Sequence, residues 1–86
     1  MAEATAATPP LTTLDTLAPG GSAVIRHLDG GSGVLSRFSA LGLAPGTRVQ
    51  VRQNFRRGPL IVQAHGTRIA LGRGEAAKIR VEEGAA

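Results

Sequence analysis

The chain has 86 residues, with 10 Lys and Arg against 6 Asp and Glu, which gives a formal net charge of +4 at neutral pH. This length suits one domain with a small core, because a chain of this size buries only about 60% of the surface that it exposes when unfolded. The absence of cysteine excludes disulfide bonds and thiolate metal ligands.

Residues 1–12 are rich in Ala, Thr and Pro, and we predict that they form a disordered tail. They lack the positive charge and the long apolar run of a secretory signal. No apolar run approaches the roughly 20 residues that a membrane-spanning helix needs. We therefore expect a cytoplasmic protein without a membrane span, with one domain over residues 13–82 and a short C-terminal tail over residues 83–86.

The predicted domain opens with a short turn and a strand. Residues 13–17 are predicted to form one helical turn, which Pro19 ends because proline cannot continue a helix. Residues 22–28 are rich in branched apolar residues, which favour a half-buried strand. The tetrapeptide Leu-Ala-Pro-Gly occurs twice, at residues 17–20 and 43–46, and each copy precedes a predicted strand.

One amphipathic helix is predicted over residues 34–41, where apolar residues recur at helical spacing. Ser32 stands at a suitable position for its N-cap. Gly42 follows where a left-handed C-cap residue belongs, and Leu43 stands where such a cap has its apolar contact. Pro45 and the glycine after it suit a type II turn.

The second half of the domain is predicted to consist of strands. Residues 48–55 alternate between apolar and polar side chains, with Phe55 on the inward side and one wet face outward. His65 and Gly66 are predicted to form a tight hairpin turn. Further strands are predicted at residues 60–64, 67–71 and 78–81. These elements indicate a mainly β fold, a closed or nearly closed small barrel of about five strands with one short α-helix.

Five short patterns in chain order resemble those of the ferrous iron transport protein A (FeoA) family. They lie at residues 14–25, 37–51, 58–62, 66–71 and 76–81, and the most characteristic of them is Leu41-Gly42-Leu43-Ala44-Pro45-Gly46 followed by a strand. The departures are mild: Phe38 stands where the family usually has Leu, and Ala40 where an acidic residue is common.

The resemblance implies an SH3-like barrel without catalytic activity or cofactor. It also implies a cytosolic accessory protein that binds the membrane ferrous-iron permease (FeoB-type) and modulates it, with self-association as a further possibility. The same domain occurs fused to metal-dependent repressors; because 86 residues suit one domain, we expect a free-standing transport accessory without a second domain that supplies a DNA-reading helix.

The helix exit is the first candidate for a partner-binding surface. A domain this small cannot bury every apolar residue of its helix, and an exposed apolar patch marks a contact site. We predict Leu41, Leu43 and Pro45 as contact residues. The alternative is that these side chains belong to the core and the cap.

A basic face is the second candidate. The segment between residues 20 and 81 contains all ten basic residues and only two acidic ones, so this part of the chain attracts anions. We predict that Arg48, Arg52, Arg56 and Arg57, with Arg68, form one face across neighbouring strands. Its partner would be an acidic permease surface or an anionic membrane leaflet; the alternative is a merely solvated strand face.

Nucleic acid is the runner-up partner, because small barrels often bind it and the charge fits. Single-strand binding uses aromatic side chains as stacking platforms, and this chain offers only Phe38 and Phe55, both predicted to face inward. Steeply salt-dependent oligonucleotide binding would support this function.

Metal binding and catalysis find little support in the sequence. The two histidines, His27 and His65, form no ligand motif, although a ferrous-iron titration would reveal a site. The glycine-rich loop at residues 30–33 lacks the Lys-Ser/Thr of a phosphate-binding loop. Asp29 and Glu75 are the only acids of the central part, and they offer no paired carboxylates. We expect neither an enzyme nor a metal site.

Overall fold

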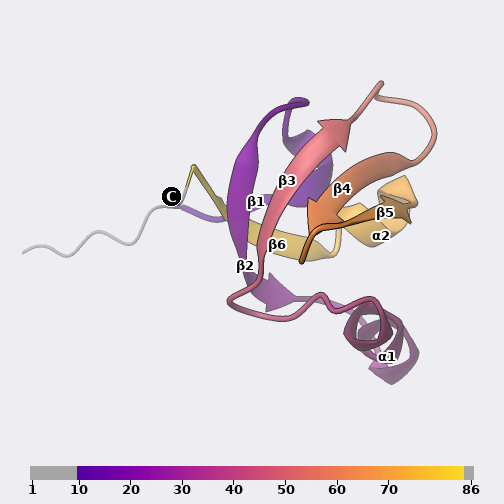
Figure 1. Cartoon of the computed structure of the whole chain (residues 1–86). Coiled ribbons are helices and arrows are strands. Elements are labelled where there is room, and N and C mark those ends of the chain that lie inside the picture. Colours follow the sequence, from indigo (N-terminus) through magenta and orange to yellow (C-terminus); the bar gives the residue numbers. More distant parts are fainter. Residues whose placement is uncertain (1–9, 85–86) are drawn as a thin grey trace, which may run out of the picture.

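The computed structural model describes residues 10–84, and most of the predicted N-terminal tail, residues 1–9, lies outside them. The elements in chain order are β1 (Thr12–Thr13), the 3-10 turn η2 (Leu14–Thr16), β2 (Ser22–Leu28), α1 (Ser32–Ala40), β3 (Arg48–Gln53), β4 (Leu60–Ala64), β5 (Thr67–Leu71), α2 (Arg73–Ala76) and β6 (Ile79–Glu83) (Figure 1). Each strand and helix predicted above is present, and β1 and the four-residue α2 are additions.

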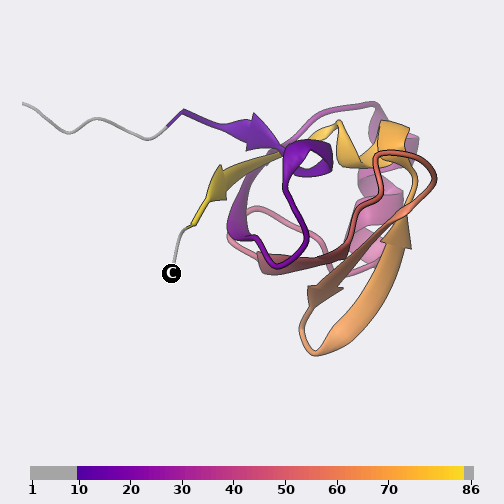
Figure 2. The same ribbon diagram turned by 90° about the horizontal axis from the view of Figure 1, so that it is seen from above.

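All six strands belong to one antiparallel sheet with the order β1-β6-β2-β3-β4-β5. The sheet curls, so that in the view from above the strands, η2 and α2 surround one centre (Figure 2). The mainly β prediction is confirmed. Within residues 10–84 the outer strands β1 and β5 do not pair, so the sheet is open, and of the closed or nearly closed barrel that we expected the fully closed form is absent. The physical reason is that β1 contributes only two residues, both paired with β6.

The core fills the inside of this curl. Every buried residue within the described part is apolar. The largest fully buried side chains are Phe38, Leu14, Ile25, Leu43, Leu60, Leu71, Ile79, Val49, Val51, Val62 and Val81. Since no polar or charged residue is buried in this range, the groups that act on other molecules must be sought on the surface.

A Schellman cap ends α1, as the sequence predicts. The N–H of Leu43 donates to the carbonyl of Phe38 at 2.9 Å, and the N–H of Gly42 donates to the carbonyl of Ser39 at 3.0 Å. Gly42 has a φ of +79°, which glycine adopts without steric cost. The cap turns the chain back so that Leu43 and Phe38 both lie in the core.

The start of α1 differs from the prediction. Gly31 is the N-cap, because its carbonyl accepts the N–H of Leu35 at 3.0 Å, and Ser32 is already helical. The helix has nine residues. In the described part of the chain, no helix has the length and apolar character that crossing a bilayer would demand.

β3 ends two residues earlier than predicted, at a β-bulge. Val51 pairs with Val62, which faces the core, whereas Gln53 pairs with Ile61, which faces the other side. One extra residue in β3 therefore moves everything after it to the opposite face. Phe55 is consequently 72% exposed, and the prediction that it faces inward is wrong.

Both ends of the domain extend one residue further than predicted. Thr12, assigned to the tail, pairs with Val81 in β1, and Glu83 pairs with Ala23 at the end of β6. The ion pair between Arg26 and Glu82, at 2.9 Å, joins β2 to this last part of β6.

The repeated tetrapeptide has one structural role in both copies. The N–H of Gly20 donates to the carbonyl of Val51, and the N–H of Gly46 donates to the carbonyl of Ile25, both at 2.7 Å. Donors and acceptors are each 26 positions apart, like the two copies of the repeat. The two Pro-Gly turns therefore flank the β2–β3 ladder symmetrically, each docked on the opposite strand.

Candidate protein-binding site at the helix exit

The segment between α1 and β3 contains the predicted apolar contact residues. Leu41 is half-buried against the core, and Pro45 is exposed. Leu43 is fully buried, which corrects the expectation that it offers its side chain to a partner. The cap described above explains the difference, because it places the residue after Gly42 back onto the core.

The hairpin turn between β4 and β5 braces this segment. His65 and Gly66 both have positive φ values, +53° and +75°, as a type I′ turn requires. The Nε2 atom of His65 lies 3.1 Å from the carbonyl oxygen of Gly42. Since a carbonyl only accepts, this contact is a hydrogen bond in the tautomer that carries its proton on Nε2. We name Leu41, Pro45, Arg48 and His65 the helix-exit surface.

A shallow groove of about 400 Å³ runs beside His65. Its polar lining comes from Ser22, Arg48, Gln50, Gln63 and His65. Gln50 and Gln63 are direct cross-strand partners on β3 and β4. The groove thus combines one permanent cation with amide groups that donate and accept, a lining suited to an acidic or polar segment of another chain.

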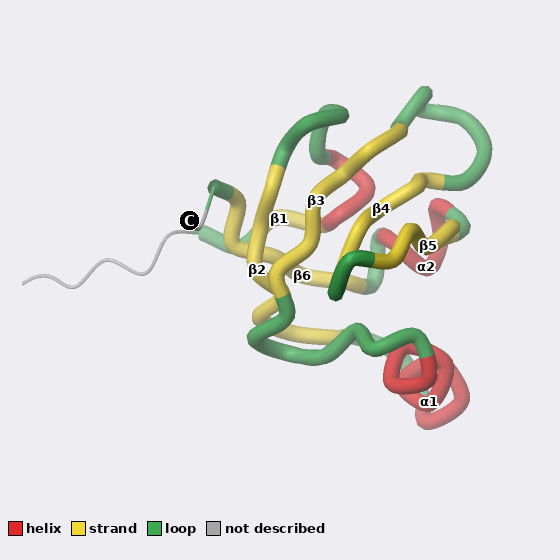
Figure 3. The backbone as a smooth tube through the Cα atoms, viewed as in Figure 1, coloured by secondary structure: helices red, strands yellow, loops and turns green. Residues whose placement is uncertain are grey.

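The predicted arginines are divided among β3, the β3–β4 loop and β5. Arg48 begins β3 beside the helix exit, and Arg52 donates from Nη1 to Oε1 of Gln50 at 3.1 Å. Arg56 and Arg57 lie beyond the other end of β3, in the β3–β4 loop (Figures 1 and 3). The length of β3, about 17 Å, separates Arg48 from Arg56 and Arg57, whereas Arg52 lies near the end of the strand, four positions before Arg56. Arg68 is opposite Gln63 in the β4–β5 pair.

The acidic side chains neutralise other cations. In the described range the ion pairs are Arg26–Glu82, Arg37–Glu75 and Arg80–Asp29, and the His27 ring also contacts the Asp29 carboxylate. None of them involves an arginine of β3 or of the β3–β4 loop. These arginines therefore keep their full charge for an external anion.

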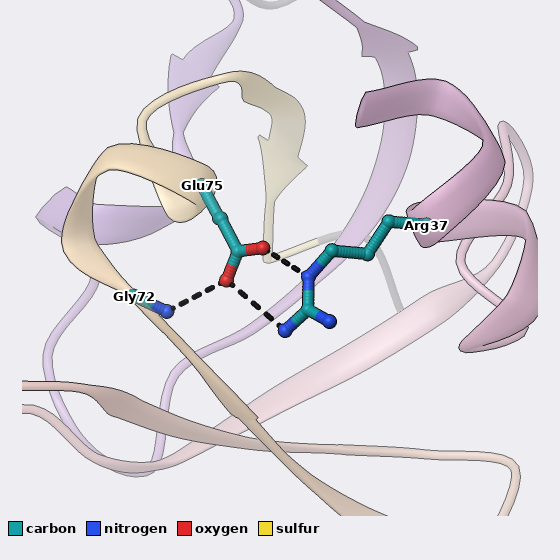
Figure 4. Close-up of polar contacts among 3 residues, drawn as sticks. All are labelled: Arg37, Gly72 and Glu75. Atoms are coloured by element: carbon teal, nitrogen blue, oxygen red, sulfur yellow. Dashed lines mark hydrogen bonds and ion pairs between the residues drawn. The ribbon is translucent and has the colours of Figure 1, made fainter. Parts of the chain in front are cut away.

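Arg37 and Glu75 connect the two helices (Figure 4). The Nε of Arg37 donates to Oε2 of Glu75, and Oε1 of Glu75 also accepts the N–H of Gly72 at 3.0 Å. These hydrogen bonds, that of Arg37 first, hold the pKa of Glu75 below its ordinary value. The contact fixes α1 against the start of α2, and so helps to position the helix exit.

The two histidines have different partners. His27 contacts Asp29 at 3.0 Å, whereas His65 contacts a backbone carbonyl. Among residues 10–84 no group of three His, Cys, Asp or Glu side chains is arranged to hold a metal ion.

Two residues of functional interest escaped the sequence analysis. The sequence predicts His65 only as a hairpin residue. Its contact with Gly42 joins turns 23 positions apart, and no local pattern in the sequence predicts such a contact. Phe55 was assigned to the core, because a β-bulge has no reliable signature in the sequence.

The fold and its surface define a small SH3-like β domain in which the polar residues lie at or near the surface. The sequence matches the FeoA domain family over residues 12–83, and the chain belongs to that family. The resemblance inferred from the five sequence patterns is thereby confirmed.

Three relatives illustrate the match. A Methanocaldococcus jannaschii protein provisionally named Fe(2+) transport protein A is 36% identical over 64 residues, 74% of this chain and 77% of that protein. The crystal structure of an iron uptake regulatory protein, FeoA, superposes with a TM-score of 0.83 at 28% identity, covering 86% of this chain and 99% of the other. Stenotrophomonas maltophilia FeoA, a prokaryotic SH3 domain protein crystallised with zinc, gives a TM-score of 0.69 at 30% identity, with coverages of 83% and 89%.

Proposed function

We propose that this chain is a small cytoplasmic, non-catalytic accessory protein of ferrous iron uptake. It binds the cytosolic side of the membrane ferrous-iron permease and modulates transport by protein–protein contact. Membership of the FeoA domain family and the names of its relatives support the link to ferrous iron transport. The purely apolar interior of the described part supports a role carried out at the surface.

The observation that carries the proposal is the contact between His65 and Gly42, 3.1 Å long, which braces the most characteristic motif of the family. The hairpin turn holds the helix exit in one conformation, so that the half-buried Leu41 and the exposed Pro45 lose little conformational freedom on binding. The partner is an acidic surface, because Arg48 has no ion pair within the described residues.

Nucleic acid binding remains the second candidate function, since the exposure of Phe55 removes the argument that both aromatic residues face inward. One exposed aromatic side chain offers a single stacking platform, whereas strand-binding barrels use several. Binding of an oligonucleotide that falls steeply with salt would favour this alternative.

The test is binding of the purified chain to the cytosolic domain of the permease of the same organism, measured by titration at low and moderate salt. Arg48→Glu is expected to weaken binding by about tenfold or more, because like charges that face each other across an interface cost several kcal/mol. Pro45→Asp is expected to act in the same direction.

Lys78→Glu is the matched control, since Lys78 is an exposed cation outside the helix-exit surface. It changes the net charge equally and is expected to have a much smaller effect. Equal losses of affinity for Arg48→Glu and Lys78→Glu would show that binding depends only on the net charge of the chain. Full binding by Arg48→Glu and Pro45→Asp would rule out the helix exit as the docking surface.

A further inference from the structure

A second exposed feature lies at the far end of β3, in the loop that leads to β4. Phe55 is 72% exposed, more than any other large apolar side chain of the described residues, and Arg56 and Arg57 follow it with exposed side chains. We name these three residues the loop tip. Single exposed apolar residues are common in proteins, so the way in which the tip is held carries the argument.

The base of the loop is tied down on both sides. At its start, Nδ2 of Asn54 donates to the carbonyls of Asp15 at 3.0 Å and Leu17 at 2.8 Å. At its end, Nη1 of Arg73 donates to the carbonyl of Gly58 at 3.4 Å, and Nη2 donates to that of Asp15 at 3.2 Å. The loop is therefore anchored to η2 and α2, and only its tip projects.

The backbone of the tip adopts an unfavourable conformation. Arg56 has a φ of +67°, in the left-handed region that a residue with a Cβ rarely occupies. Its N–H donates to Oδ1 of Asn54 at 3.1 Å, which holds the conformation in place. Such outliers persist where the surroundings enforce them and gather at functional sites. Together with the β-bulge in β3, this conformation keeps Phe55 directed away from the core.

The tip also carries two cations that form no ion pair in the described range, although Asp15 lines the same pocket as Arg56. None of the ion pairs in the described range involves Arg56 or Arg57, and the carboxylates in those pairs belong to Asp29, Glu75 and Glu82. The tip thus presents one aromatic ring and two guanidinium groups on a braced, projecting loop.

We propose that the loop tip docks on an anionic membrane surface, with Phe55 in the headgroup layer and Arg56 and Arg57 against lipid phosphates. Aromatic rings and cations are the side chains that favour this layer. A protein partner is less favoured, because a binding hot spot needs surrounding contacts that exclude water. The other exposed large apolar residues of the described part, Leu11 and Leu35, lie outside this loop and do not surround Phe55 in sequence.

The inference builds on the proposed function, since an accessory of a permease works next to a bilayer. The tip and the helix exit lie at opposite ends of β3, so that one can contact lipid while the other contacts the permease (Figure 1). The membrane contact would add to the affinity for the permease by raising the local concentration of the chain.

Fluorescence offers a direct test, because the chain contains no Trp and no Tyr. The variant Phe55→Trp has a single fluorophore at the tip, and the variant Leu35→Trp has one on α1. With vesicles of phosphatidylglycerol and phosphatidylcholine, Trp emission of the first variant is expected to shift to the blue and to be quenched by brominated acyl chains. Unshifted emission, or an equal shift in both variants, would contradict insertion of the tip.

Co-sedimentation with the same vesicles measures the contribution of each group. Phe55→Ser is expected to lower the partition coefficient by about tenfold. Replacement of both Arg56 and Arg57 by Gln is expected to lower it by about 25-fold, or about fivefold per cation. Vesicles of phosphatidylcholine alone are expected to bind neither the native chain nor the variants.

The double variant Arg68→Gln/Lys78→Gln is the control, because it removes the same charge from exposed positions outside the tip. Equal losses in the two double variants would overturn the proposal, since binding would then depend on net charge alone. Binding to single-stranded oligonucleotides in place of vesicles, lost with Phe55→Ser, would assign the tip to nucleic acid. Because the vesicles contain no permease, the vesicle experiments test the loop tip whether or not the chain binds the permease in the titration.

Discussion

The imidazole of His65 and the carbonyl of Gly42, 23 positions apart in the chain, meet at 3.1 Å. Each belongs to a turn with positive φ, one between two strands and the other at the end of α1. Their contact holds two tight turns against each other, so that the helix exit has a rigid neighbour. A Cβ on residue 42 would lie 3.3 Å from Cδ2 of His65, which leaves no spare room there.

Two substitutions of His65 should distinguish the contribution of its hydrogen bond to stability from that of its backbone conformation. His65→Asn keeps a residue that tolerates positive φ, and it should cost about 1 kcal/mol of unfolding free energy through the lost hydrogen bond. His65→Val should cost about 1–2 kcal/mol more, because a β-branched residue is strained at this φ. Urea unfolding measures both, and equal midpoints for the two variants would contradict the strain at this turn.

Burial of Leu43 predicts a loss of stability rather than a selective loss of binding. Leu43→Ala should lower the unfolding free energy by about 2–5 kcal/mol, the usual range for a buried leucine. Leu43→Asp should abolish the folded state, as seen in the far-UV circular dichroism spectrum. Pro45→Ala, at an exposed neighbouring position, should change stability by less than about 1 kcal/mol. A folded Leu43→Asp variant would show that this side chain is not part of the core.

The two copies of the repeat should respond alike to substitution. Gly20 and Gly46 have φ values of +89° and +93°, and an added Cβ would meet nothing within 4 Å at either position. Gly→Ala at each should therefore cost about 1–2 kcal/mol through backbone strain alone. Gly33→Ala is the control: this residue lies in α1 with open space around it, and alanine there should stabilise by about 0.5–1 kcal/mol. Thermal unfolding would reveal any inequality between the two copies.

The ion pair between Arg37 and Glu75 predicts a dependence of stability on pH. The pKa of Glu75 is lower in the folded state, so its carboxylate contributes stability above the pKa of an unfolded Glu, about 4.3. This contribution is lost as the pH falls through the folded-state pKa. Glu75→Gln should thus be less stable than the native chain at pH 7 and should approach it in acid. The difference is small and screened by salt, because both side chains are partly exposed. Urea midpoints at both pH values measure it, and a constant difference would contradict the charge effect.

Most of the secondary structure follows from patterns a few residues long. The period of the apolar residues places α1 and the strands, because one face of each must leave water. The C-cap of α1 and the hairpin turn follow from single glycines whose φ only glycine adopts freely, as at Gly42 and Gly66. Family membership follows from the same local patterns, since their order and spacing survive in the sequence.

The functional surface depends on contacts between distant parts of the chain. The pairing of β3 with β4 places the bulge that exposes Phe55. The cap on α1 buries Leu43 within a core to which every element except β1 contributes. The length of β3 separates Arg48 from Arg56. Sequence alone therefore determined most of the elements, the turns and the family, because these rest on local conformational preference. Tertiary structure decided which side chains reach the surface, because pairing register and packing join residues that are far apart in the chain.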